Sequence, residues 1–221
     1  MPKTSLTRAA FIAGVLAVGS LAAAPQAFAS RNGDAEQYVQ DHATDALATL
    51  AGHAPASQRR QTFDQLMAQF ADMPRIANFV LGRYSATLRT DASLRTDWNR
   101  TFQDYAVAVY EDQLDAFSGG TLRVNGSVER IPGRDVIVNS TLTPRTGGRP
   151  TIVQWRLLRT GDIWKVVDVS LLVDGNQIWL AQQQQADFLA RLDRSNGNVR
   201  SLIADVRGQT ATMRQRILAR S

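Results

Sequence analysis

The sequence TLRVNGSVERIPGRDVIVNSTLTPRTGGRPTIVQWRLLRTGDIWKVVDVSL, residues 121–171, decides the fold. Apolar residues alternate with polar ones in four short runs, a period typical of strands that bury one face. The runs cover 121–128, 136–142, 153–157 and 163–171, and turns are predicted at Pro132-Gly133, at 144–148 and at Gly161-Asp162. Short turns between successive strands predict hairpins. We therefore predict an antiparallel meander of four strands with one apolar face.

The sequence on both sides of this stretch changes to the period of a helix, with apolar residues three and four positions apart. Helices are predicted over 35–50, over 58–70 with Ser57 as the cap, over 74–82, from Asp91 to 118–120, from Asp174-Gly175 to 194 and over 199–206. An exposed apolar sheet face needs a cover, and these helices are the available one. The predicted class is α+β, with one domain over 30–207 and a polar helical tail over 208–221.

The first 29 residues have the pattern of a secretory signal peptide. Lys3 and Arg8 give a positive start, 9–24 is uncharged and largely apolar, and Ala27-Phe28-Ala29 is a small-x-small cleavage site. An uncleaved anchor helix is the alternative, but the apolar run is shorter than the ~20 residues of a membrane span. We predict cleavage after Ala29 and a soluble protein in a bacterial periplasm.

Composition excludes several function classes. The 221 residues contain no cysteine and two histidines, His42 and His53, so disulfides, thiol nucleophiles and multi-histidine metal centres are excluded. Lys and Arg exceed Asp and Glu by 25 − 20 = +5. Removal of Lys3 and Arg8 with the signal leaves 23 − 20 = +3, spread along the chain. Nucleic-acid binding needs a concentrated basic footprint, so we expect neither a nucleic-acid partner nor a metal or cofactor.

Motifs for catalysis are also absent from the sequence. There is no nucleophile elbow and no Gly-rich phosphate loop. Two alternatives to a binding protein stay open. One is an enzyme with an apolar pocket that uses Tyr84 or Asp168 on a small hydrophobic substrate, although the pattern favours Asp168 as a hydrogen-bonded structural residue. The other is a structural protein whose Arg-bearing tail docks on an acidic surface of a partner.

Two blocks of sequence together resemble a known family. The first is Ile76-Ala77-x-Phe79-Val80-Leu81-Gly82-Arg83-Tyr84, and the second is Gly161-x-x-Trp164-Lys165-Val166-Val167-Asp168-Val169 followed by Asp174-Gly175. In order and spacing they resemble the MlaC or toluene-tolerance family of periplasmic lipid-binding proteins, over roughly 35–206. The segment 171–175 and the Arg-containing tail resemble the hopanoid-biosynthesis-associated branch of that family.

The resemblance implies a fold and a role. The fold would be related to the NTF2-like cone, with acyl chains held in an apolar cavity between sheet and helices. The role would be that of a non-enzymatic lipid shuttle and auxiliary component of an ABC transporter that maintains outer-membrane lipid asymmetry. Its partners would be a phospholipid or hopanoid, an inner-membrane ABC transporter complex and an outer-membrane lipoprotein complex.

The residues expected to contact lipid are the apolar ones on the sheet face and on the helices opposite it. They are Phe79, Val80, Tyr84, Phe102, Tyr105, Val109, Val136, Val138, Val153, Trp155, Leu157, Val167 and Val169. Periodicity does not distinguish a cavity wall from a closed core, so both interpretations stay open. Arg83 is the candidate for a phosphate headgroup, whereas the amides at Asn176, Gln177 and 182–185 suit a neutral head such as that of a hopanoid.

Overall fold

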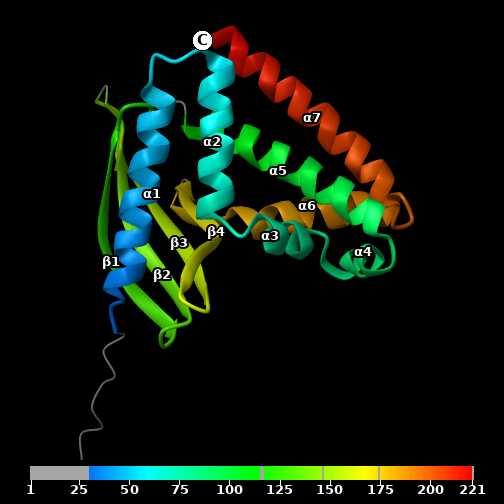
Figure 1. The fold of residues 1–221 in the computed structure, drawn as a ribbon, viewed down its shortest axis with the longest axis horizontal. Coiled ribbons are helices and arrows are strands. Elements are labelled where there is room, and N and C mark those ends of the chain that lie inside the picture. The colour runs from blue at the N-terminus through cyan, green and yellow to red at the C-terminus, as the bar shows by residue number, and fades with distance from the viewer. Residues whose placement is uncertain (1–29, 115–116, 146, 174, 221) are drawn as a thin grey trace, which may run out of the picture.

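The computed structural model describes residues 30–114, 117–145, 147–173 and 175–220, so the predicted signal peptide lies outside it. A five-stranded antiparallel sheet forms one side of the molecule (Figure 1). Its strands follow one another in sequence order: β1 (Thr121–Ile131), β2 (Asp135–Thr143), β3 (Thr151–Thr160), β4 (Ile163–Val173) and β5 (Asn176–Trp179). The predicted α+β class and the four-stranded meander are confirmed.

The fifth strand was not predicted. The sequence predicted a helix directly after Asp174-Gly175, but Asn176–Trp179 pairs with the end of β4 and the helix begins at Leu180. Gly175 adopts a positive φ of 80°, which glycine accepts without steric cost and which turns the chain back on itself. Four residues with two exposed amide side chains are too short to show a strand period.

A bulge in β4 changes which residues face the helices. Simple alternation placed Ile163, Val167 and Val169 on one face, yet the register pairs Leu157 with Val166 and Arg156 with Asp168, so Val167 has no partner on β3. The extra residue shifts the alternation by one position. Val166 is consequently buried, whereas Ile163 is 60% exposed at the hairpin tip.

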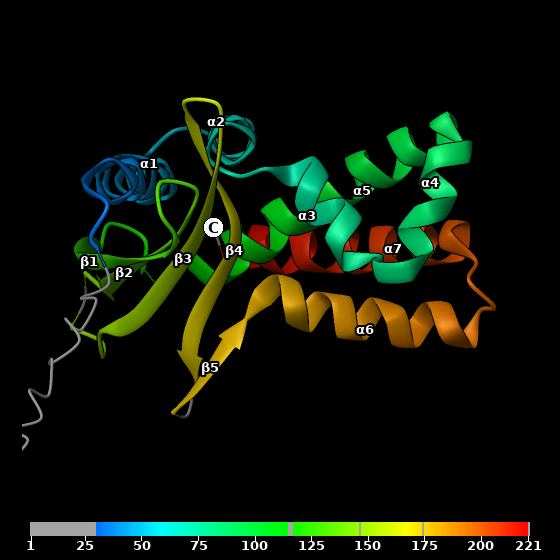
Figure 2. The same ribbon diagram turned by 90° about the horizontal axis from the view of Figure 1, so that it is seen from below.

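The helices cover the inner face of the sheet in two groups, as Figure 2 shows from below. Helix α1 lies over β1 and β2, whereas α3 and α6 pack near β4. The helical elements are α1 (Gly33–Ala51), α2 (Ala56–Phe70), α3 (Met73–Val80), the 3-10 turn η1 (Gly82–Ala86), α4 (Thr87–Thr90), α5 (Ala92–Leu114), α6 (Leu180–Arg194) and α7 (Val199–Arg220). In the described ranges no helix is long and apolar enough to cross a bilayer.

The ends of the helices follow from capping residues. Asp91 accepts a hydrogen bond from the Leu94 N–H at 2.8 Å and starts α5, as its position predicted. The Asp72 carboxylate accepts from the Arg75 N–H and caps α3. The prediction that Ser57 caps α2 is wrong, because Pro55 precedes the first turn and the helix already begins at Ala56.

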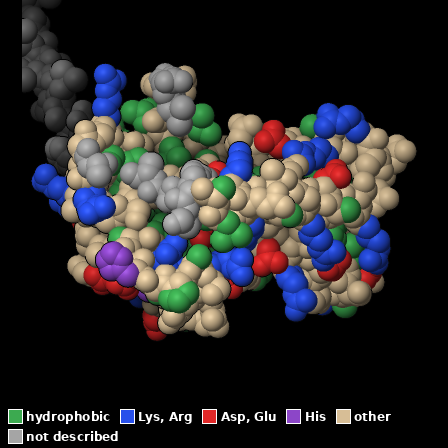
Figure 3. Space-filling model, turned by 90° about the horizontal axis from the view of Figure 1, so that it is seen from above, with side chains coloured by type: hydrophobic (Ala, Val, Ile, Leu, Met, Phe, Trp, Pro, Cys, Tyr) green, Lys and Arg blue, Asp and Glu red, His purple; other side chains and the backbone are tan. Residues whose placement is uncertain are grey.

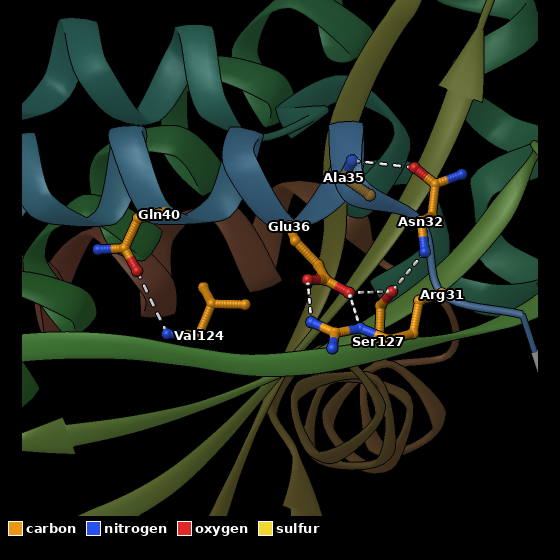
Figure 4. A network of polar contacts seen from close by, with 7 residues as sticks. All are labelled: Arg31, Asn32, Ala35, Glu36, Gln40, Val124 and Ser127. Atoms are coloured by element: carbon orange, nitrogen blue, oxygen red, sulfur yellow. Dashed lines mark hydrogen bonds and ion pairs between the residues drawn. The ribbon is translucent and has the colours of Figure 1, made fainter.

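Helix α1 is fastened to β1 by a polar network (Figure 4). Glu36 pairs with Arg31 at 2.6 Å and accepts a hydrogen bond from the Ser127 hydroxyl at 2.7 Å. Asn32 caps the helix and donates its own N–H to the same hydroxyl at 2.7 Å. The ion pair with Arg31 lowers the pKa of Glu36 below its usual value, so the carboxylate stays charged in this partly buried position.

A glutamine continues this attachment along the strand. The Gln40 side chain accepts from the Val124 N–H at 3.2 Å (Figure 4). It also donates to the Leu122 carbonyl at 3.2 Å. An amide side chain thus takes the two hydrogen bonds that a neighbouring strand would otherwise make. Because β1 is an edge strand, these bonds protect it from pairing with another chain.

Helix α7 runs without a break through Gly208, so the predicted boundary between 207 and 208 falls inside one helix. It packs along α5, three ion pairs join the two helices, and a fourth joins α7 to Asp91, the residue that caps α5. These are Arg200–Asp91 at 2.8 Å, Arg207–Asp97, Arg214–Glu111 at 2.7 Å and Arg216–Asp112 at 3.6 Å. The acidic surface on which these four arginines dock is therefore that of the protein's own α5.

A candidate lipid-binding cavity

A narrow apolar cavity lies between the sheet and the helices. The volume of the cavity is about 80 Å³. Its lining is Ala43, Ala46, Leu47, Met67, Phe70, Ala71, Met73, Ile76, Phe102, Ala106, Tyr110, Gln113, Leu114, Phe117, Leu122, Leu142, Val153, Trp155, Val166, Asp168, Val169, Leu171, Leu180, Ala181 and Gln184. The inner face of the protein is thus part closed core and part cavity.

Small and flexible side chains create this space. Ala43, Ala46 and Leu47 lie three and four residues apart, so they share the face of α1 that looks onto the cavity. The alanines leave room that larger residues would fill. Met67 of α2 and Met73 of α3 also line the cavity, and methionine is the apolar side chain that repacks most readily. The side chains of this wall can therefore rearrange to admit a long apolar ligand.

The mouth lies where α5 ends and α6 begins. Gln113 is exposed and Leu114, Phe117 and Gln184 are partly exposed, whereas the lining residues from α1 and α2 are buried. Seen from above, hydrophobic side chains show at the centre of the face among Lys and Arg side chains (Figure 3). An apolar interior with amides at its rim suits a ligand that has an apolar body and a polar end.

Asp168 is the one charged residue among the described lining residues, and its hydrogen bonds are structural. Its Oδ1 accepts from the Val169 N–H at 2.8 Å and from the Ala181 N–H at 2.9 Å, and the second bond satisfies the first turn of α6. Burial raises the pKa of Asp168 although these two N–H groups oppose the shift. The carboxylate therefore holds β4 to α6.

Tyr110 adds a second polar group to the cavity wall. Its side chain comes from the last turns of α5, next to the mouth. Burial, followed by the charge of Asp168, raises the pKa of Tyr110 well above its usual range. The phenol thus stays protonated at any physiological pH and serves as a neutral hydrogen-bonding group.

The residues predicted from sequence to contact lipid divide into three groups. Those that line the cavity are Phe102, Val153, Trp155 and Val169. Those that are buried outside it are Val80, Val136, Val138, Leu157 and the bulge residue Val167. Those that are partly or largely exposed outside it are Phe79, Tyr84, Tyr105 and Val109.

Arg83 and Tyr84 lie away from the cavity. Both contact Asp193 at the C-terminal end of α6, the Tyr84 hydroxyl at 2.6 Å, and the Arg83 guanidinium lies 4.9 Å from the centre of the Tyr84 ring. The cavity borders the other end of α6 at Gln184, which is nine residues or roughly 13 Å along the helix. The structure therefore does not bring Arg83 to the mouth.

Sequence reasoning missed the walls that α1, α2 and the end of α5 supply. Met67 and Phe70 lie in the helix predicted over 58–70, but an apolar helix face has the same period whether it packs on a core or lines a void. Ala46 and Ala106 also fit the apolar period of their helices, but nothing in the sequence shows that their small side chains leave space. Tyr110 stands four residues after Ala106 and eight after Phe102, one and two turns along the same helix face, a spacing from which it could have been found.

Comparison with known proteins bears on this geometry. A family model described as MlaC protein matches residues 37–208. A comparison with curated proteins found no match. Among solved structures, the phospholipid-binding protein from Ralstonia solanacearum, solved in complex with a phospholipid, is similar with a TM-score of 0.68 at 21% identity. The similarity covers 81% of this chain and 98% of that chain, and it supports the fold. Because the family match extends over most of the sequence, the chain belongs to the MlaC family.

Proposed function

We propose that the protein is a periplasmic phospholipid carrier that encloses acyl chain in the cavity and leaves the headgroup at the mouth. The observation that carries the proposal is the cavity itself, with apolar walls and a rim of amides. The phospholipid bound to the Ralstonia solanacearum protein, which shares the fold, supports the same ligand class. The signal pattern in residues 1–29 supports export.

The energetics favour such a site. Each methylene that leaves water gains about 0.8 kcal/mol, so even one acyl chain offers a large driving force for entry. The cavity volume before binding is only about 80 Å³, so entry of an acyl chain requires the walls to part. Met67 and Met73 can change rotamer at small cost, and the separation of α1 from α5 would widen the space further.

The proposed acyl contacts are Phe102, Val153, Trp155 and Val169. Beside them, the Phe70 ring of α2 is tilted against the Trp155 ring, with 5.4 Å between the ring centres. For the phosphate we propose Arg145. Its side chain packs against Gly119, so closely that a Cβ there would lie 3.1 Å from the Arg145 Cδ. Gly119 is two residues from Phe117 at the mouth, and Arg145 makes no ion pair within the described ranges.

The wider role is that of a shuttle that exchanges lipid with an inner-membrane ABC transporter and an outer-membrane lipoprotein complex. The family supports this role. A carrier needs no catalytic group. Tyr84 lies outside the cavity, where its hydroxyl contacts Asp193. The Asp168 carboxylate does line the cavity, but its Oδ1 is taken by the Val169 and Ala181 N–H groups. These positions favour a carrier over the alternative enzyme.

A hopanoid remains the second candidate ligand, because Gln113 and Gln184 at the mouth suit a neutral hydroxylated head as well as a phosphate. Competitive loading separates the two. The purified protein is incubated with vesicles that contain phosphatidylglycerol and a hopanoid, and the lipid that it removes is identified by mass spectrometry.

We expect phosphatidylglycerol to be taken up, and uptake to fall in Arg145→Ala but not in Arg83→Ala. Exclusive hopanoid uptake would overturn the ligand class. Uptake of neither lipid would overturn the carrier function itself.

A further inference from the structure

A cleft rich in arginine lies at the end of the sheet opposite to the cavity mouth. Arg75 of α3, Arg134 of the β1–β2 turn and Arg159 of β3 line it, with Ile131 at its edge. We call this site the arginine cleft. Strands of nine to eleven residues at about 3.3 Å per residue separate it from the mouth, so it does not belong to the lipid site.

Arg159 is held in place with most of its donors unused. Its guanidinium lies 5.6 Å from the centre of the buried Trp164 ring. Its one ion pair within the described residues, with the fully exposed Asp162, is long at 3.4 Å. Its Nε is buried, and among the described residues it has no acceptor. An arginine that is stacked on an aromatic ring has already lost part of its side-chain freedom, so binding an oxyanion costs it less.

The surroundings of Arg159 are positive. Arg134 is exposed and has no ion pair in the part of the chain that the structure describes. The buried Asp135 is already occupied by Arg156 at 2.9 Å and by Arg130 at 3.6 Å. The cleft therefore has guanidinium groups in excess of the carboxylates that could neutralise them.

Exposed aliphatic side chains flank these charges. Ile131 at the end of β1 is 53% exposed and Ile163 at the start of β4 is 60% exposed. Both stand beside hairpin turns at this lower end of the molecule (Figure 1). A surface that combines guanidinium groups with exposed isoleucine is complementary to a segment that carries carboxylates and aliphatic residues.

We infer that the arginine cleft binds an acidic segment of a partner protein, whose carboxylates contact Arg159 and Arg134. A membrane surface would offer phosphates instead. The position of the cleft disfavours a membrane as its ligand, because a membrane bound here would lie far from the mouth through which lipid would leave. A partner protein bound at this end would leave the mouth open.

Fluorescence anisotropy tests the inference with a labelled oligoglutamate peptide, an oligoglutamine peptide of the same length and phosphatidylglycerol vesicles. The purified wild-type protein is compared with the variants Arg159→Gln and Arg134→Gln and with the control variant Arg89→Gln. Arg89 is an exposed arginine on α4, at the other side of the molecule (Figure 1). Lipid loading is measured on every variant, so a failure of the carrier function is recognised separately.

We expect the oligoglutamate peptide alone to bind, and each cleft variant to weaken its binding about tenfold, the loss typical of one charge-assisted hydrogen bond. Arg89→Gln should leave it unchanged. Equal loss in Arg89→Gln would overturn the inference in favour of diffuse charge. Binding to vesicles that depends on Arg159, without binding to the peptide, would overturn it in favour of a membrane site. The absence of peptide binding would also overturn it.

Discussion

Filling the cavity should weaken lipid binding without harming the fold. Ala106 lines the cavity from α5, so Ala106→Leu places three additional carbon atoms where acyl chain would lie. At about 0.8 kcal/mol for each displaced methylene, lipid binding should lose about 2.4 kcal/mol, or roughly fiftyfold in Kd. The free protein should keep or gain stability, because the leucine fills empty space and has nearly the helix propensity of alanine.

Ala108 is the matched control. It lies two residues further along α5, is fully buried and does not line the cavity. Ala108→Leu should overpack the interior and cost ~1–3 kcal/mol of stability while lipid affinity per folded molecule stays the same. Affinity is measured by transfer of labelled phosphatidylglycerol from vesicles, and stability by urea unfolding. Wild-type affinity in Ala106→Leu, or an equal loss of affinity in Ala108→Leu, would refute the cavity as the lipid site.

Three further predictions concern charged residues, and urea unfolding measures each. Because the pKa of Glu36 is lowered in the fold, its charge stabilises the folded state fully above the unfolded pKa of about 4.3. This stabilisation is lost as the pH falls through the folded pKa. Glu36→Gln should remove the acid sensitivity, and an unchanged pH profile of stability in the variant would contradict this prediction. Because the pKa of Asp168 is raised in the fold, the free energy of unfolding falls as the pH rises from the pKa of Asp168 in the unfolded chain to its pKa in the fold. Asp168→Asn should therefore be at least as stable as the wild type at pH 7. Asp168→Ala should lose ~1–3 kcal/mol of stability, because two N–H groups are left without an acceptor. The reverse order of stability would exclude a structural role for Asp168. Arg214→Gln should cost about 2 kcal/mol of stability because it leaves Glu111 partly buried and unpaired. The double variant with Glu111→Gln should cost less. A larger loss in the double variant would contradict a stabilising pair between Arg214 and Glu111.

The sheet could be predicted from sequence because alternation survives in the central strands β2 and β3. Val136 and Val138 on β2, and Val153 and Leu157 on β3, are buried on the predicted face. The pattern failed at the bulge, since one extra residue at Val167 changes the face of its neighbours without changing the composition. It failed again at β5, which is too short to show a period.

The cavity could be predicted only as an apolar surface. Val138 and Val153 are the same residue type with the same alternation, yet Val153 lines the cavity and Val138 is closed core. What separates them is the packing of α1 and α5, where Ala46 and Ala106 leave space that no periodicity reports. Arg83 illustrates the same limit for charge, because proximity in sequence to an aromatic motif says nothing of its distance from the mouth.

Photo-crosslinking tests the central claim most directly. A phosphatidylglycerol with a diazirine near the end of one acyl chain is loaded from vesicles and activated by light, and the modified peptides are identified by mass spectrometry. The proposed site predicts crosslinks to Phe102 and Ala106 on α5 and to Val153 on β3, all lost in Ala106→Leu at limiting lipid. Crosslinks confined to the outer surface, or to the hairpins around the arginine cleft, would contradict the claim that the acyl chain lies in this cavity.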